Sequence, residues 1–404
     1  MWNLTKEAKK RFQTCNLLPI HESDGDWESE FEYAKEEGID LTKRLAEDLE
    51  MVKEELLTVL PSRFIPFVED GTLNQPTLPK SVREDYLQWM RECDKEFEEI
   101  LATAYENTKS TIPYLSENVQ EVFNDSLHDS IIERIERENQ NLHIFLNAEG
   151  GFTNKTIIHF IFKDVLREES DEPLQIGQWF IYNELKKTDK GFAFRVLLDC
   201  PDSEWTIEAQ NIDASYYYRP VNYAKLRDER RIMDKSIEEY IQELNKDQHQ
   251  QYFFITPDAN ITISGFKDSA PFVNLEVGEI QLKDQKLILS LNQNSFEYDL
   301  KEQSFIHFIY TDIYEDPYAQ FNIAVPIDEL EQAVFSDDLD YQVRAWNTMY
   351  SNPEETKDIV NRIFMKMDVT EENEMMLSIY LNHFNKHKVL TENVLSKFAT
   401  LIDE

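Results

Sequence analysis

The spacing of apolar residues changes from a helical to a strand period close to Leu127, and this change constrains the fold more than any other feature of the sequence. Before this point, apolar residues recur three or four positions apart, as on one face of a helix. After it, they alternate with polar residues, as in a half-buried strand. We therefore expect an α+β protein in which N-terminal helices are followed by an antiparallel sheet.

Several helices are marked in the first 125 residues. An apolar stripe predicts a helix that Asp40 caps and Pro61 ends, with the residues Leu41, Leu45, Leu49, Val52, Leu56 and Val59. A second helix is expected to start at a capping box formed by Ser81 and Glu84. A short third helix is predicted from Ser116 to about residue 124. The prolines between residues 61 and 80 predict a connection.

Strands are predicted from Leu127 onward. The segments IIERIEREN and NLHIFLN flank the turn-forming residues Asn139, Gln140 and Asn141, which indicates a β-hairpin. Four further segments then alternate in the same way: KTIIHFIFKDV, QWFIYNEL, GFAFRVLLD and EWTIEAQNI. Together these segments predict a meander of five or six strands.

The chain is long enough for two or three domains, since a domain takes roughly 150 residues. We place a boundary at residues 222/223, where a proline and the densest basic cluster of the chain interrupt the strand pattern. Residues 1–222 are then a helical lead-in with an antiparallel β domain. Residues 223–404 are expected to form a second antiparallel sheet, a β meander, with a C-terminal helical bundle whose helices begin near Ser336, Pro353, Thr370 and Thr391.

Charge and motif content exclude several classes of protein. The chain carries 41 basic and 79 acidic residues, a net charge of −38, which would repel nucleic-acid phosphate. The nine glycines form none of the common nucleotide-binding or hydrolase loops, so no cofactor is predicted. Three scattered cysteines and the lack of an apolar run of about 18 residues favour a cytoplasmic protein that does not enter a membrane.

Three segments carry a resemblance to a known family. They are LHDSIIERIERENQNLHIFLN, WFIYNELKKTDKGFAFRVLLD and WTIEAQNI. With the helices before them, they resemble a family of Firmicutes proteins catalogued as a domain of unknown function, over about residues 1 to 215. The segment from Leu127 to Ser130 and the strand after it are also similar to small proteins of bacterial toxin and immunity loci. Neither resemblance implies an activity or catalytic residues.

A candidate binding site lies in the second half of the chain. Between Glu297 and Asp340 there are 12 acidic residues and one basic residue, Lys301. Aromatic residues are interleaved with the acids, and the predicted contact residues are Asp312, Glu315, Asp316, Tyr314 and Tyr318. Carboxylates and tyrosines suit the binding of a basic protein surface, because the carboxylates steer the encounter electrostatically and the tyrosine rings supply contact area. The alternative is a solvated loop and helix face of an acidic protein.

Two histidine motifs are candidate metal sites. His128 and Asp129, with Asp125 nearby, have side chains that suit zinc, iron or manganese, but their alternative role is local hydrogen bonding at a helix end. His383 and His387 have helical spacing, but Phe384 stands where a zinc protease needs its glutamate base. No metal ligand or catalytic residue is therefore assigned.

Three hypotheses for function follow from these features. The first is a non-enzymatic cytoplasmic module that binds a basic protein, with an immunity- or antitoxin-like factor as one form. The second is a metal-dependent hydrolase that uses His128 and Asp129. The third is an inhibitor that mimics DNA.

Overall fold

The computed structural model describes residues 2–18, 20–221, 251–256, 260–264, 273–274, 278–283, 286–291, 294–299, 309–370 and 373–402. By their contacts, the described residues up to Arg219 and those between 251 and 313 form one compact unit. Pro220 and the residues from Tyr314 onward belong to a second unit. The predicted boundary at residues 222/223 lies outside the described residues.

The first unit starts with helices: α1 (Lys6–Cys15), α2 (Asp24–Glu36), α3 (Leu41–Val59), α4 (Ile65–Glu69), α5 (Lys80–Thr111), η1 (Ile112–Tyr114) and α6 (Glu117–Phe123). As predicted, Asp40 caps α3, because its side chain accepts a hydrogen bond of 3.1 Å from the N–H of Lys43. The predicted capping box at Ser81 is wrong, since α5 already begins at Lys80 after Pro79. Ser81 is thus inside the helix, where it cannot cap it.

Helix α2 was not predicted, because its sequence is dominated by exposed acids. Only Trp27 and Ala34 are buried in it, which is too few to give a visible helical stripe. Its start is nevertheless specified locally. Ser23 and Asp26 form a reciprocal capping box, in which each side chain accepts a hydrogen bond from the other residue's N–H.

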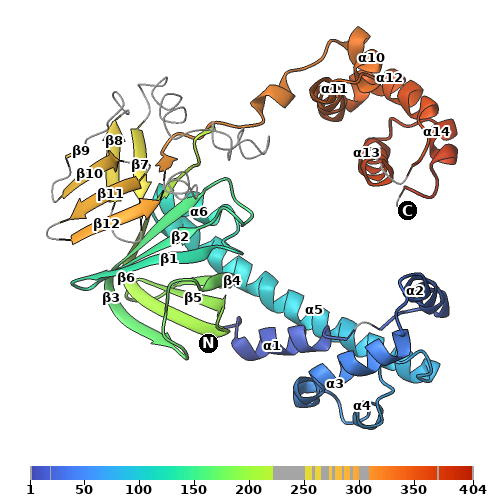
Figure 1. The fold of residues 1–404 in the computed structure, drawn as a ribbon, viewed down its shortest axis with the longest axis horizontal. Coiled ribbons are helices and arrows are strands. Elements are labelled where there is room, and N and C mark those ends of the chain that lie inside the picture. The colour runs from blue at the N-terminus through green and yellow to red at the C-terminus, as the bar shows by residue number, and fades with distance from the viewer. Residues whose placement is uncertain are drawn as a thin grey trace. The chain divides into compact units, whose positions relative to one another are not determined.

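Six antiparallel strands close into a barrel: β1 (Ile131–Glu138), β2 (Asn141–Asn147), β3 (Ile157–Ser170), β4 (Trp179–Lys187), β5 (Phe192–Asp199) and β6 (Ser203–Tyr217) (Figure 1). The β1–β2 hairpin and the number of strands are confirmed. The predicted meander order is wrong, because the order around the barrel is β1-β2-β3-β6-β5-β4. The two longest strands, β3 and β6, pair along most of their length, and β4 closes the barrel on β1.

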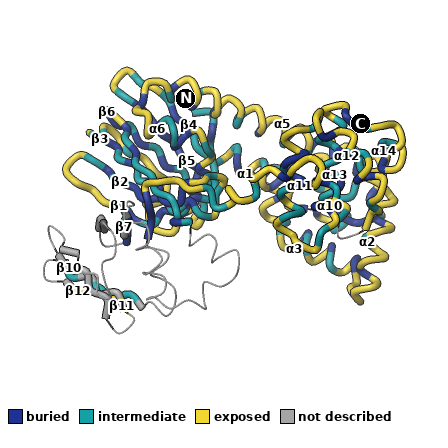
Figure 2. The backbone as a smooth tube through the Cα atoms, turned by 90° about the horizontal axis from the view of Figure 1, so that it is seen from above, coloured by how far each residue is buried: buried dark blue, intermediate teal, exposed yellow. Residues whose placement is uncertain are grey.

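The barrel interior is a packed hydrophobic core. Its largest side chains are Phe160, Phe162, Phe180, Phe194 and Trp205, each at most 1% exposed. Phe123 of α6 joins this core, with its ring centroid 5.6 Å from that of Phe194. Figure 2 shows the buried residues concentrated along these strands. The side chains fill a barrel of this size, so the interior is a core and not a ligand channel.

Among the described residues, the strands after residue 250 form two small antiparallel sheets, where a single second sheet was predicted. One has the order β12-β11-β10-β9, and the other has the order β13-β7-β8. Their strands are β7 (Gln251–Ile255), β8 (Asn260–Ser264), β9 (Val273–Asn274), β10 (Gly278–Lys283), β11 (Lys286–Leu291), β12 (Asn294–Asp299) and β13 (Ile309–Thr311). The three-stranded sheet contacts the barrel, where Nη1 of Arg134 donates a hydrogen bond of 2.6 Å to the carbonyl of Thr256.

The second unit is helical, as predicted for the C-terminus. Its elements are η4 (Ala319–Asn322), η5 (Ile327–Glu329), α10 (Leu330–Val334), α11 (Leu339–Ser351), α12 (Pro353–Lys366), α13 (Glu374–Lys386) and α14 (Glu392–Lys397). Trp346, Phe364 and Phe384 lie in its buried core. No helix among the described residues of either unit is long and apolar enough to cross a membrane.

Candidate functional site

The predicted contact residues lie in a short exposed segment directly after β13. Tyr314 is 47% exposed and Tyr318 is 49% exposed. Glu315 between them is also exposed. These three residues belong to the second unit, while Asp312, also exposed, is at the end of the first unit. The segment therefore presents both tyrosine rings and carboxylates to solvent.

Asp316 has a different role from its neighbours, because it shapes the turn. Its carboxylate accepts a hydrogen bond of 2.8 Å from the N–H of Tyr318 and one of 3.3 Å from Nδ2 of Asn322. Asp316 is half-buried, and the ring of Tyr318 stacks on that of Phe321 with centroids 6.3 Å apart. An aspartate that accepts from a backbone N–H two residues later is typical of turns. Asp316 thus positions Tyr318.

Acids further along the chain are paired inside the helical unit. Glu331 accepts hydrogen bonds from Lys366 at 2.5 Å and from Arg362 at 3.1 Å, and these two bonds lower the pKa of its carboxyl. Glu329 accepts a hydrogen bond of 2.6 Å from the hydroxyl of Tyr341, which raises the pKa of that hydroxyl. These two acids are therefore engaged in ion pairs and hydrogen bonds within the helical unit.

The second candidate, His128 with Asp129, lies in the loop between α6 and β1. Nδ1 of His128 is 3.0 Å from Oδ1 of Asp129. Asp129 has a left-handed backbone, with φ of 65°, and its N–H donates a hydrogen bond of 2.8 Å to the carbonyl of Phe180. Gly151 passes so close that a Cβ there would be 2.6 Å from the carbonyl oxygen of His128. The loop is therefore held by tight local packing.

Asp125 does not join His128 and Asp129 in a ligand set. Its carboxylate accepts hydrogen bonds of 2.6 Å from Nζ of the buried Lys155 and of 2.8 Å from Oγ1 of Thr153. Throughout the part of the chain that the structure describes, no three His, Cys, Asp or Glu side chains are placed to hold a metal ion together. At the C-terminus, Nε2 of His383 is 2.9 Å from the carbonyl oxygen of Tyr350, so this nitrogen is engaged with the backbone.

A cleft of about 530 Å³ beside His128 was not predicted from the sequence. It lies between α5, α6 and β4, and its lining includes Tyr105, Lys109, Asp125 and Tyr182. Burial raises the pKa of the Tyr182 hydroxyl. The volume is in the range of small-molecule sites, which is about 300–1,000 Å³. No periodic signal could have located this cleft, because its residues come from segments that are far apart in the sequence.

The fold defines the class of the protein as a mixed α and β protein built on a closed, filled six-stranded barrel. Residues 3–209, just over half of the chain, match the family described as "Protein of unknown function (DUF4085)". The chain therefore belongs to this family. The match confirms the resemblance of the N-terminal half to an uncharacterised domain family. No curated protein and no solved structure matches the chain.

Proposed function

We propose that the protein is a non-enzymatic protein-binding module whose partner has a basic surface. The observation that supports this proposal most is the exposure of Tyr314, Glu315 and Tyr318 in one short segment. A tyrosine offers apolar contact area together with a hydroxyl, and it is enriched at protein interfaces. Carboxylates beside the rings match a basic partner and discriminate against an acidic one.

The charge of the whole chain supports the same kind of partner. A net charge of −38 attracts a basic surface over distances beyond direct contact and orients the encounter. Salt screens this attraction, with a Debye length of about 10 Å at 0.1 M. Association with the partner is therefore expected to slow as the salt concentration rises, while dissociation changes less.

In the form that we favour, the protein is an immunity- or antitoxin-like factor in the cytoplasm of a Firmicutes bacterium. The similarity of Leu127 to Ser130, and of the strand after them, to proteins of toxin and immunity loci supports this form. A factor of this kind would bind a basic toxin and block it without performing chemistry. The partner recovered from the native cytoplasm at low salt would then be toxic when expressed alone.

The test compares two variants with equal changes in charge. The first replaces Asp312, Glu315 and Asp316 by Asn, Gln and Asn, and the second replaces three exposed acids on α2 by glutamine: Glu28, Glu32 and Glu36. Each variant has a net charge of −38 + 3 = −35. Asp316→Asn keeps an oxygen that can accept the hydrogen bond from the N–H of Tyr318, so this contact of the turn is kept.

The proposal predicts different association rates for these two variants. The variant at residues 312–316 should associate with the captured partner about tenfold more slowly than the wild type, because local charges steer the encounter. The α2 variant should slow only through the smaller total charge. Equal rates for both variants, or a partner whose association is indifferent to salt, would contradict the proposal.

An inhibitor that mimics DNA is a special case of a binding module, and the identity of the captured partner would reveal it. If the partner is a DNA-binding protein, duplex DNA should displace it from this chain in competition. A basic partner that duplex DNA does not displace would exclude mimicry while leaving the binding module intact.

A metal-dependent hydrolase is the second candidate, and the cleft beside His128 is the observation that favours it. Metal analysis of the native protein separates it from a binding module. A stoichiometric ion that is lost in both His128→Ala and Asp129→Ala would support the hydrolase. A protein isolated without such an ion, and with no hydrolytic activity after zinc, iron or manganese is added, would exclude it.

A further inference from the structure

Two buried cysteines from distant parts of the sequence meet where α1 packs on α5. Cys15 is the last residue of α1, and Cys93 lies within α5, 93 − 15 = 78 positions later. Their exposed fractions are 0% and 2%, and both belong to one hydrophobic cluster. Burial, and next the neighbouring Cys93, raises the pKa of the Cys15 thiol, which agrees with neighbouring positions of the two residues in this cluster.

Three contacts around the thiols set the register of the two helices. Nη1 of Arg11 is 3.0 Å from Oε2 of Glu96. One residue further along each helix, the rings of Phe12 and Phe97 stack with centroids 4.7 Å apart. Directly after each cysteine, Nδ2 of Asn16 donates a hydrogen bond of 2.8 Å to Asp94. These contacts therefore bring Cys15 and Cys93 to neighbouring positions where α1 packs on α5.

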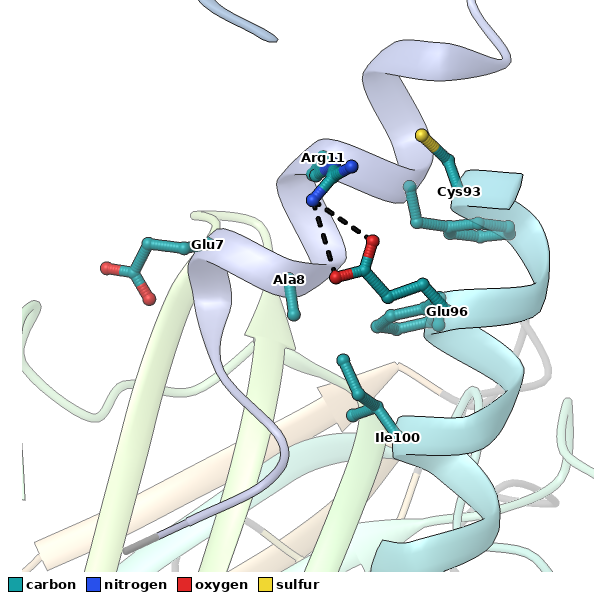
Figure 3. A pocket seen from close by; sticks show the side chains of 8 residues that line it. Glu7, Ala8, Arg11, Cys93, Glu96 and Ile100 are labelled. Atoms are coloured by element: carbon teal, nitrogen blue, oxygen red, sulfur yellow. Dashed lines mark hydrogen bonds and ion pairs between the residues drawn. The ribbon is translucent and has the colours of Figure 1, made fainter. Parts of the chain in front are cut away.

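A cavity of about 200 Å³ leads to one of the two thiols. It lies between α1 and α5, and Cys93 is part of its lining together with Arg11, Phe97 and Ile100. Figure 3 shows the Cys93 sulfur directed toward α1, beside the ion pair of Arg11 and Glu96. A water molecule takes up about 30 Å³, so a small peroxide fits in this space.

We propose that Cys15 and Cys93 are an oxidation site, at which hydrogen peroxide converts the two thiols into an intramolecular disulfide. Cys93 reacts first, because it lines the cavity. Its thiolate attacks the O–O bond, so that Cys93 becomes a sulfenic acid and the second oxygen leaves as hydroxide, which takes up the thiol proton to form water.

The second step joins the two sulfurs. The sulfur of Cys15 attacks that of Cys93, the S–O bond breaks, and the oxygen leaves as water with the proton of Cys15. The two cysteines lose two electrons, and one peroxide is reduced to two waters. Burial raises the pKa of the Cys15 thiol, so this second step is expected to be slow.

The crosslink would close a loop that contains the acidic helices α2 and α3. Helix α1 is already attached to the barrel, because Nζ of the buried Lys9 is 2.6 Å from Oδ1 of Asp202. Joining α1 to α5 would therefore tie the helices to each other and to the barrel. This inference is independent of the proposed binding function, since it concerns residues far from 312–318 in the sequence.

The test counts free thiols in the full-length protein before and after peroxide treatment. The reduced protein has three free cysteines, and Cys200 is the exposed one. After oxidation, denaturation and alkylation, the site predicts one alkylated cysteine and a tryptic peptide in which Cys15 is linked to Cys93. Dithiothreitol should restore three alkylated cysteines, and the oxidised protein should melt at a higher temperature than the reduced one.

Variants separate this disulfide from other products. Cys200→Ser should still form the crosslink, whereas Cys15→Ser and Cys93→Ser should not. The peptide map of the wild type and of Cys200→Ser shows whether Cys15 is linked to Cys93, even if the other two variants fail to fold. Three alkylated cysteines after oxidation, a sulfinic acid without a crosslink, or a dimer joined through Cys200 would overturn the proposal.

Discussion

Glu184 of β4 holds the N-terminal segment on the barrel, and its substitution tests this part of the fold. Its carboxylate is fully buried and accepts hydrogen bonds from the N–H groups of Asn3 and Leu4, both at 3.2 Å. It also accepts from the side chains of Asn3 at 3.0 Å, Asn107 at 2.8 Å and Lys186 at 2.7 Å. Burial raises the pKa of this carboxyl, but the hydrogen bonds outweigh burial, and the net pKa is lowered.

The effect of Glu184→Gln on the free energy of opening of the N-terminal segment follows from the hydrogen-bond donors that lose their acceptor. The glutamine oxygen can still accept from Asn107 and Lys186, but its NH₂ group then faces the N–H groups of Asn3 and Leu4. Two hydrogen bonds to a charged group are lost, each of about 1.5 kcal/mol at the lower end of the usual range. The N-terminal segment should therefore open more easily by about 3 kcal/mol, a factor of about 100.

Hydrogen exchange of the N-terminal peptide measures this opening directly. The amides of Asn3 and Leu4 should exchange about 100-fold faster in Glu184→Gln, or at the rate of an unprotected amide if that is reached first. Glu208→Gln is the matched control, because Glu208 accepts one hydrogen bond, from Oγ1 of Thr188, which a glutamine oxygen can also accept. Unchanged exchange in Glu184→Gln, or equal effects in both variants, would refute the reasoning.

Three further substitutions test the first unit. Burial, followed by the charges of His143 and Arg134, lowers the pKa of His159 to about 3 from 6.5, so the wild type should lose stability as pH falls below 6.5. His159→Gln should show a shallower pH dependence in chemical unfolding, and equal slopes would contradict the assignment. Gly191→Ala should destabilise the protein at the β4–β5 turn by about 3 kcal/mol or more, because the alanine Cβ would lie 2.2 Å from a carbonyl oxygen. An unchanged melting temperature would disprove this strain. Asp129→Ala should lower the free energy of unfolding by about 1 kcal/mol in thermal unfolding, since alanine tolerates a φ of 65° less well than aspartate. A gain in stability would argue against a structural role of Asp129.

Local features of the fold were predictable, because they are determined by residues that are consecutive in the sequence. The β1–β2 hairpin followed from alternation on either side of Asn139, whose φ of 57° suits an asparagine in a turn. Helix α3 followed from its leucine spacing and from Asp40 as the cap. Helix α14 likewise starts after Thr391, near the predicted residue.

Pairings between distant segments were not predictable in the same way. Alternation identifies β3, β4 and β6 as strands, but it does not say that β3 pairs with β6 and leaves β4 to close the barrel. The cleft beside His128 and the meeting of Cys15 with Cys93 also depend on tertiary packing. For the candidate site, the sequence named Asp316 as a contact residue, but it did not show that the Asp316 carboxylate serves the turn.

The most direct test of the proposed binding function is photo-crosslinking in the native cells. A photoreactive phenylalanine analogue is placed at Tyr318, and in a separate protein at Tyr33 of α2, which is 56% exposed and also surrounded by acids. The account predicts that position 318 crosslinks one basic protein and that position 33 does not. An absence of crosslinks from position 318, the same products from both positions, or an acidic partner would contradict it.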